Sequence, residues 1–376
     1  MFRMPAASVL SSVSGLVTRV AVSALVALLT VPVHGQDTDE SHRPVEGEDY
    51  LVYDIVGRSS SFAAVLKALS DTDVVLVGEQ HDDDVGHRFE AELLGAAYRR
   101  LHAEGGRQVI LSLEMFEWDV QYILAEYLDG TISETHFLNS SRPWPSYDDR
   151  YRPLIEFSKA HGLTVVAANA PRRYVNRVSR EGPKSLQVLS ATAKSFLPPL
   201  PYPGPSSEYR AQWDLVMAEA MRAEEAQTDS STADADSDEA GSDEAGAEEA
   251  ADEEAGAEEA DAEEADVEET PRHEAMSPNV IHSQALWDAA MGHAVTSALG
   301  ASPGSLVIHV AGSFHVERGT GIPVRVADYA PGTRVLSIVM VSVGDIMVWD
   351  EKEHEGLGDF VVLTRQPPAV PEGSGN

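Results

Sequence analysis

Short, unbroken apolar runs alternate with longer amphipathic segments along most of this chain, and this alternation limits the fold more than any other feature. The first run, residues 73–77, reads DVVLV and ends at Gly78. Comparable runs occupy residues 109–113, 164–167 and 306–310. A continuous apolar run of this length is typical of a strand that is covered on both faces. Strands alternating with helices predict an α/β fold with an open, mainly parallel sheet flanked by helices.

The segments between these runs have the periodicity of helices. After the first run, apolar residues recur at every fourth position, namely Phe89, Leu93, Ala97 and Leu101. Gly105 and Gly106 follow them, as a helix C-cap would. We expect the three aspartates 82–84 to lie at the N-terminus of this helix, where carboxylates meet free N–H groups. Another helix, with Leu286, Ala290 and Ala294, is predicted before the fourth run.

All four predicted strands end in a polar cluster. The clusters read GEQH from Gly78, EMF from Glu114, NAPRR from Asn169 and GSFH from Gly312. In open α/β sheets, binding and catalytic groups collect beyond the carboxyl ends of the strands. We therefore expect one crevice at that edge, with Glu79 and His81 on one side of an extended segment and with Glu114 and His315 nearby.

Much of the acidity of the chain is confined to one segment. The formal charge is −35, but residues 229–269 hold 20 acidic and no basic side chains, which leaves 42 acidic against 27 basic residues elsewhere. Like charges and few apolar residues predict a disordered acidic insertion over residues 224–274. The remainder has no basic stripe, so a nucleic-acid partner is not expected.

The N-terminal 35 residues have the pattern of an export signal. Arg3 and Arg19 supply positive charge, and an apolar run over residues 20–33 is short for a membrane span. Whether the signal is cleaved or retained as an anchor stays open. The chain contains no cysteine, so we expect an exported periplasmic or extracellular protein that is not a lipoprotein. After a flexible segment 36–48, one α/β domain is expected over residues 49–364, and a flexible tail over 365–376.

The order of the motifs resembles the ChaN family of haem-binding uptake proteins, within the Tiki superfamily. The residues that carry the resemblance are GEQHD after the first strand, LEMFEWDVQ after the second, RPWPSYDDRYRPL before the third, SQALWDAAM before the fourth and GSFHVERGTGIP after it. The resemblance spans about residues 52–348. It departs from the usual pattern in lacking the lipoprotein cysteine and in carrying the acidic insertion.

The resemblance implies a haem-binding protein of haem or iron uptake. Haem would be held between two copies of the chain, with outer-membrane uptake components as further partners. A haem site needs an axial ligand, an apolar slot and cations for the propionates. The candidate haem-binding residues are His81, His315, Tyr147, Tyr151, Tyr174, Arg172 and Arg173.

Two other functions remain open. Tiki relatives are proposed to be metal-dependent proteases, which implies a divalent transition metal held by Glu79, His81, Glu114 and His315, with Glu79 and His81 as catalytic groups. A metal-free esterase with a His81 base, similar to erythromycin esterases, is a variant of this hypothesis. The second alternative is an inactive crevice that serves as a scaffold for the acidic insertion.

Overall fold

The computed structural model describes residues 43–218, 221–222 and 277–366. The predicted export signal and acidic insertion lie outside the described residues, as does the tail beyond Gln366. Within the described ranges, no helix combines the length and the apolar character needed to cross a membrane.

Seven strands form one sheet in the order β1-β7-β6-β2-β5-β3-β4. Only β1, at one edge, is antiparallel to its neighbour, and the other pairs are parallel. This confirms the predicted open, mainly parallel sheet. The strands are β1 (Tyr50–Asp54), β2 (Val74–Glu79), β3 (Val109–Glu117), β4 (Thr164–Asn169), β5 (Leu306–Gly312), β6 (Val335–Val343) and β7 (Phe360–Arg365).

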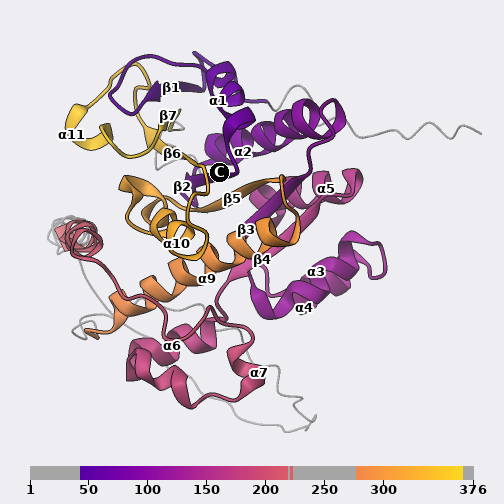
Figure 1. The fold of residues 1–376 in the computed structure, drawn as a ribbon. Helices are drawn as coiled ribbons and strands as arrows, with labels where there is room; N and C mark the ends of the chain where they lie inside the picture. Colours follow the sequence, from indigo (N-terminus) through magenta and orange to yellow (C-terminus); the bar gives the residue numbers. More distant parts are fainter. Residues whose placement is uncertain (1–42, 219–220, 223–276, 367–376) are drawn as a thin grey trace, which may run out of the picture. The chain divides into compact units, whose positions relative to one another are not determined.

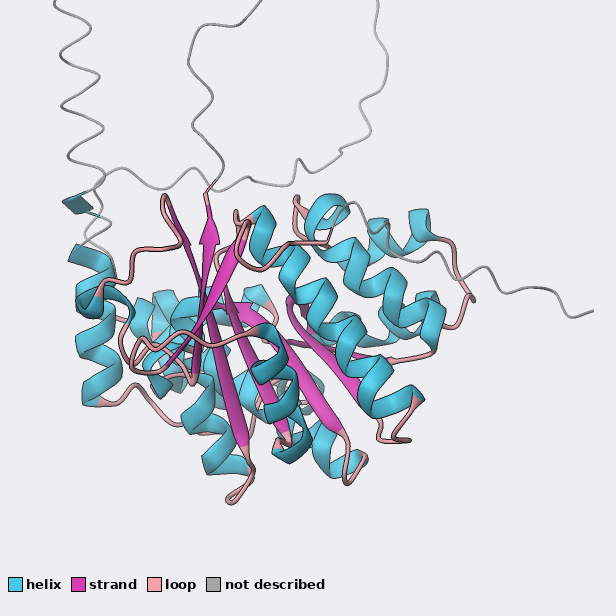
Figure 2. Cartoon of the chain, turned by 90° about the horizontal axis from the view of Figure 1, so that it is seen from above, coloured by secondary structure: helices cyan, strands magenta, loops and turns pink. Residues whose placement is uncertain are grey.

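Helices cover both faces of the sheet (Figures 1 and 2). They are α1 (Phe62–Ala68), α2 (Asp84–Ala97), α3 (Gln121–Leu128), α4 (Glu134–Ser141), α5 (Arg152–His161), α6 (Arg172–Glu181), α7 (Ala191–Lys194), α9 (Val280–Ala301), α10 (Ile322–Tyr329) and α11 (Glu351–His354). A further helix begins at residue 207. The expected N-terminus of α2 is confirmed, because Asp83 is its N-cap and accepts a hydrogen bond from the Val85 amide at 3.0 Å.

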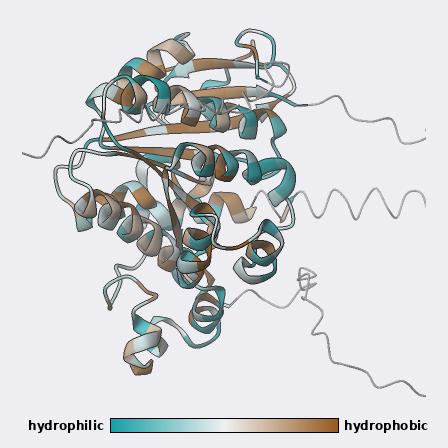
Figure 3. Cartoon of the chain, turned by 90° about the vertical axis from the view of Figure 1, so that its right-hand side faces the viewer, coloured by the Kyte–Doolittle hydropathy of each residue, from teal (hydrophilic) through white to brown (hydrophobic). Residues whose placement is uncertain are grey.

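The core has one layer on each face because successive residues of a strand point to opposite sides. In β2, Val75 and Val77 join the cluster that contains helices α2 and α5, whereas Val74 and Leu76 join the cluster that contains α9 and α10. All six residues of β2 are buried, as the unbroken apolar run predicts. Figure 3 shows the strands mostly brown, with flanking helices that carry both teal and brown stretches.

The two central strands, β2 and β5, lead to opposite faces of the sheet. The chain leaves β2 into α2, and it leaves β5 toward α10, which packs in the other core layer. Neighbouring parallel strands that diverge in this way form a topological switch point, and the space beyond their carboxyl ends is the usual ligand site of such sheets.

Candidate functional site

A cleft of about 980 Å³ lies beyond the carboxyl ends of β2 and β5. This volume is in the range of small-molecule sites, about 300–1,000 Å³. Apolar surface comes from Trp213 and Val216, on the helix that begins at residue 207, and from Phe314, while Arg150 adds a cation. The lining consists of Glu79, Gln80, His81, Asp82, Ser146, Arg150, Trp213, Val216, Gln284, Gly312, Ser313, Phe314, His315, Ser342 and Gln366.

The two G-x-x-H motifs interlock at the base of the cleft. Glu79 pairs with Gly312 in the register of β2 and β5, so the two loops leave the sheet side by side. A Cβ added at Gly78 would lie 3.0 Å from the Ser313 backbone, and one at Gly312 would lie 3.1 Å from the His81 ring. Each glycine therefore makes room for the loop of the other motif.

His81 stands at the cleft with half of its side chain exposed, and Glu79 fixes its ring. Its Nδ1 lies 2.7 Å from Glu79 Oε1, and the same oxygen accepts a 2.6 Å hydrogen bond from the Tyr151 hydroxyl. An imidazole that donates from Nδ1 to a carboxylate has its Nε2 lone pair available for a metal or a proton. The Trp144 ring packs edge-on against the imidazole with centroids 4.9 Å apart.

The charges around His81 shift the pKa values of the pair in opposite directions. Burial alone lowers the pKa of His81, but the hydrogen bond and the charge of Glu79 outweigh it and raise that pKa. Burial raises the pKa of Glu79, but hydrogen bonds from His81 and Tyr151 and the charge of His87 outweigh it and lower that pKa. Both shifts favour a charged pair over two neutral groups.

His315, from the second motif, forms a separate pair on the β5 side. Its Nδ1 lies 2.7 Å from Asp288 Oδ1 on α9, and its Nε2 lies 3.9 Å from Glu114 Oε1. Burial lowers the pKa of His315, but the charge of Asp288 outweighs it and raises the pKa to about 9. Glu114 also accepts a 2.8 Å hydrogen bond from the Gly312 amide.

Glu114 lies where β3 is irregular. The register between β3 and β4 shifts between Leu113 and Glu117. Such irregularities re-aim side chains near functional sites. The shift coincides with the carboxylate that reaches across to Gly312 and His315.

The predicted metal-ligand set divides into the Glu79–His81 and Glu114–His315 pairs. Among the described residues, the one group of three or more ligand types close enough to hold an ion is Glu79, His87 and Glu90. The structure therefore does not bring Glu79, His81, Glu114 and His315 together around one ion. The role of these four residues as metal ligands stays a prediction.

The other predicted haem-binding residues do not line the cleft. Tyr147 packs in the core against Phe116 and Phe137, and the Tyr151 hydroxyl is held by Glu79. Arg173 lies over the Tyr174 ring and bonds to Asp119. Arg172 is exposed at the start of α6. Of the seven predicted residues, only His81 and His315 reach the cleft.

Several residues of the site were missed by the sequence analysis. His87 and Glu90 lie on the buried face of α2, and their signal is two polar residues three positions apart on a face that also carries Phe89 and Leu93. Asp288 falls within the SQALWDAAM motif, on the helix predicted before the fourth strand. Arg150 likewise falls within the RPWPSYDDRYRPL motif. Trp213 carries no comparable signal, because only tertiary packing brings it to β2 and β5.

Comparisons with known proteins agree with this architecture. Residues 65–326 match the family described as haem-binding uptake, Tiki superfamily, ChaN. A solved structure of ChaN from Campylobacter jejuni, described as binding haem cofacially, has a TM-score of 0.54 and 15% identity. It covers 86% of this chain and 100% of that one. At this identity, the likeness shows the shared fold.

Two other similarities are narrower or weaker. A 141-residue stretch is 27% identical to the chloroplastic protein RETICULATA-RELATED 5 of Arabidopsis thaliana, and it spans 36% of this chain but only 18% of that relative's length. An erythromycin esterase in its open conformation has a TM-score of 0.37 and 11% identity over 84% of this chain and 82% of that one. This second likeness is too weak to support an argument about activity.

Proposed function

The chain belongs to the ChaN family of haem-binding uptake proteins in the Tiki superfamily, and we propose that it binds haem in the cleft between the ends of β2 and β5. The observation that carries the proposal is His81, which lines the cleft with its Nδ1 held by a buried carboxylate. Bound haem would supply an iron atom with an axial position, and His81 Nε2 would give up its proton to serve as the axial ligand.

The walls of the cleft offer the other features of a haem site. Trp213, Val216 and Phe314 provide apolar surface for the porphyrin face. Arg150 is placed to attract a propionate, although its guanidinium also donates to the His81 and Asp82 carbonyls and pairs with Asp84. His315 is the second imidazole at the cleft and the alternative ligand.

Export and a role in haem or iron uptake extend the same proposal. The pattern of the first 35 residues and the family support them. A second copy of the chain covering the haem is part of the same proposal and rests on the family resemblance. Leu215, an exposed apolar side chain on the helix that carries Trp213 and Val216, would be covered in such a dimer.

The proposal is tested by titrating haemin into the purified protein and following the Soret absorbance. Changing His81→Ala removes the ligand, so we expect at least a tenfold loss of affinity and a shifted Soret maximum. His136→Ala is the matched control, because His136 is exposed on α4 and does not line the cleft. Equal affinity and spectra for the two variants would contradict His81 as the ligand, and His315→Ala then tests the alternative.

A further inference from the structure

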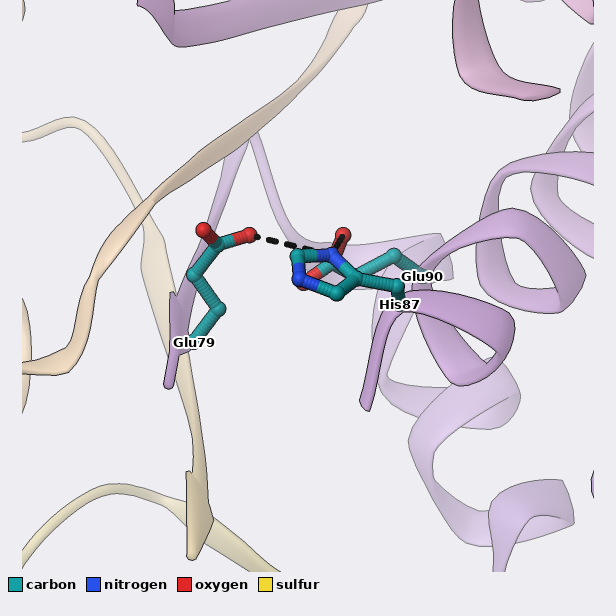
Figure 4. A group of neighbouring side chains, drawn as sticks. All are labelled: Glu79, His87 and Glu90. Carbon is teal, nitrogen blue, oxygen red and sulfur yellow. Dashed lines mark hydrogen bonds and ion pairs between the residues drawn. The ribbon is translucent and has the colours of Figure 1, made fainter. Parts of the chain in front are cut away.

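Behind the floor of the cleft, three buried side chains converge from β2 and α2. The side chains of Glu79, His87 and Glu90 are 1%, 3% and 0% exposed. Figure 4 shows Glu79 reaching from the strand toward His87 and Glu90, which both project from the helix. Glu79 belongs to the cleft as well, whereas His87 and Glu90 lie behind it.

The distances between the ligand atoms suit a single metal ion. His87 Nδ1 lies 3.3 Å from Glu90 Oε2 and 3.6 Å from Glu79 Oε2. One nitrogen and two oxygens, one from each residue, all lie within 4.8 Å of one another. Ligand atoms about 2.1 Å from a tetrahedral metal are separated by roughly 3.4 Å, so the two distances from His87 need little adjustment.

Hydrogen bonds outside the group orient each ligand. His87 Nε2 lies 3.2 Å from the His81 carbonyl oxygen, which can only accept, so Nε2 carries a hydrogen. Nδ1 is therefore the nitrogen that faces the carboxylates, and a metal would bind there in place of the Nδ1 proton. Glu79 Oε1 is occupied by Tyr151 and His81, which leaves Oε2 for the group. Metal-binding histidines and carboxylates are commonly fixed by outer contacts of this kind.

Two buried oxygens of the group lack a donor. Neither Glu79 Oε2 nor Glu90 Oε1 has a hydrogen-bond donor among the described residues. Two carboxylates this close together in a buried site require either shared protons or a cation. A divalent ion coordinated by both carboxylates and His87 would satisfy both oxygens and neutralise both charges.

We propose that Glu79, His87 and Glu90 bind a divalent first-row transition metal of the zinc class. One imidazole and two carboxylates are a donor set that zinc, iron and manganese accept. Three protein ligands leave a coordination position for water. The ion would tie β2 to α2 and hold the Glu79 carboxylate, whose other oxygen contacts His81.

Zinc content of the haem-free, full-length protein tests this proposal. After equilibration with Zn²⁺ and desalting, we expect about one zinc per chain by elemental analysis, and less than a tenth of that in Glu90→Gln. Glu114→Gln is the matched control, because Glu114 is a buried carboxylate near the cleft that lies outside the group. The acidic segment 224–274 is the same in both variants. Any zinc that it binds weakly therefore contributes equally to the two measured zinc contents.

Equal zinc in Glu90→Gln and the unmodified protein, or no zinc in the unmodified protein, would overturn the proposal. If Glu90→Gln does not fold by circular dichroism, His87→Gln and the Co²⁺ spectrum of the unmodified protein replace it. We expect bound Co²⁺ to show the visible d–d bands of a low-coordinate site. The absence of these bands would count against the proposed metal site. Zinc content and haemin binding are measured separately on Glu90→Gln and on the unmodified protein, so failure of the metal site and failure of haem binding are distinguishable.

Discussion

The orientation and the pKa of two histidines in the site depend on the carboxylates beside them. His81 and His315 both use Nδ1 to contact an acidic oxygen at 2.7 Å, from Glu79 in one case and from Asp288 in the other. Burial alone would lower both pKa values, yet both are raised because the adjacent carboxylates favour the charged rings. The carboxylate that favours the charged ring belongs to the same motif for His81, where it is Glu79, and to α9 for His315, where it is Asp288.

The Asp288–His315 pair predicts a dependence of stability on pH. The folded pKa of His315, about 9, lies above the value of about 6.5 for an unfolded histidine. The pair therefore stabilises the protein fully below about pH 6.5, and this contribution is lost as the pH rises through about 9. Its upper limit is on the order of 3 kcal/mol.

Urea unfolding of the unmodified protein and of Asp288→Asn between pH 6 and pH 10 checks this prediction. The variant should be less stable at pH 6, and the difference should shrink toward pH 10. His87, with a pKa raised to about 9 by Glu90 and Glu79 against the effect of burial, titrates in both proteins and cancels. A difference that does not change with pH would contradict the charged pair.

At the scale of elements, the ends of β2 and β5 pack closely against each other because a glycine in each leaves room for the other loop. The Gly78 backbone approaches Ser313, and the Gly312 backbone approaches His81, so each strand end limits the position of the other motif. The neighbouring register of Glu79 and Gly312 brings the two loops together although 233 positions of sequence separate them. The cleft therefore depends on correct pairing of these two central strands.

Substituting these glycines tests the close fit. Gly78→Ala places a methyl 3.0 Å from the Ser313 backbone, which cannot move freely, so we expect a loss of about 1–3 kcal/mol in the free energy of unfolding. Gly312→Ala instead meets the His81 ring, and should weaken haemin binding more than it lowers stability. Gly344→Ala is the control, because no atom lies within 4 Å of its added Cβ. Similar effects at all three positions would contradict the interlocking of the motifs.

At the scale of the whole molecule, the sheet and the edge that holds the cleft could be predicted from the sequence. Four buried strands could be predicted because each is an unbroken apolar run. The polar clusters at the ends of these runs predicted the position of the cleft. Strands β1, β6 and β7 were not predicted. β1, for example, has five residues and pairs with β7 about 300 residues further along the chain.

The composition of the site was harder to predict than its position. Tyr147 and Tyr151 have ligand chemistry, but helix packing turns one into the core and the other toward Glu79. His87 and Glu90 were missed because their role depends on contact with Glu79 at the end of β2, and the sequence of the helix alone does not show that contact. Periodicity identifies the face but not that partner.

The most direct test of the account is a haemin titration of the unmodified, full-length protein, followed by Soret absorbance and by quenching of tryptophan fluorescence. Trp144 and Trp213 lie at or beside the cleft, so both signals should saturate together. We predict saturation at a fixed haem-to-chain ratio, with one Soret maximum throughout. Absorbance that rises in proportion to added haemin without saturating, or quenching that does not follow it, would contradict a haem site at the ends of β2 and β5.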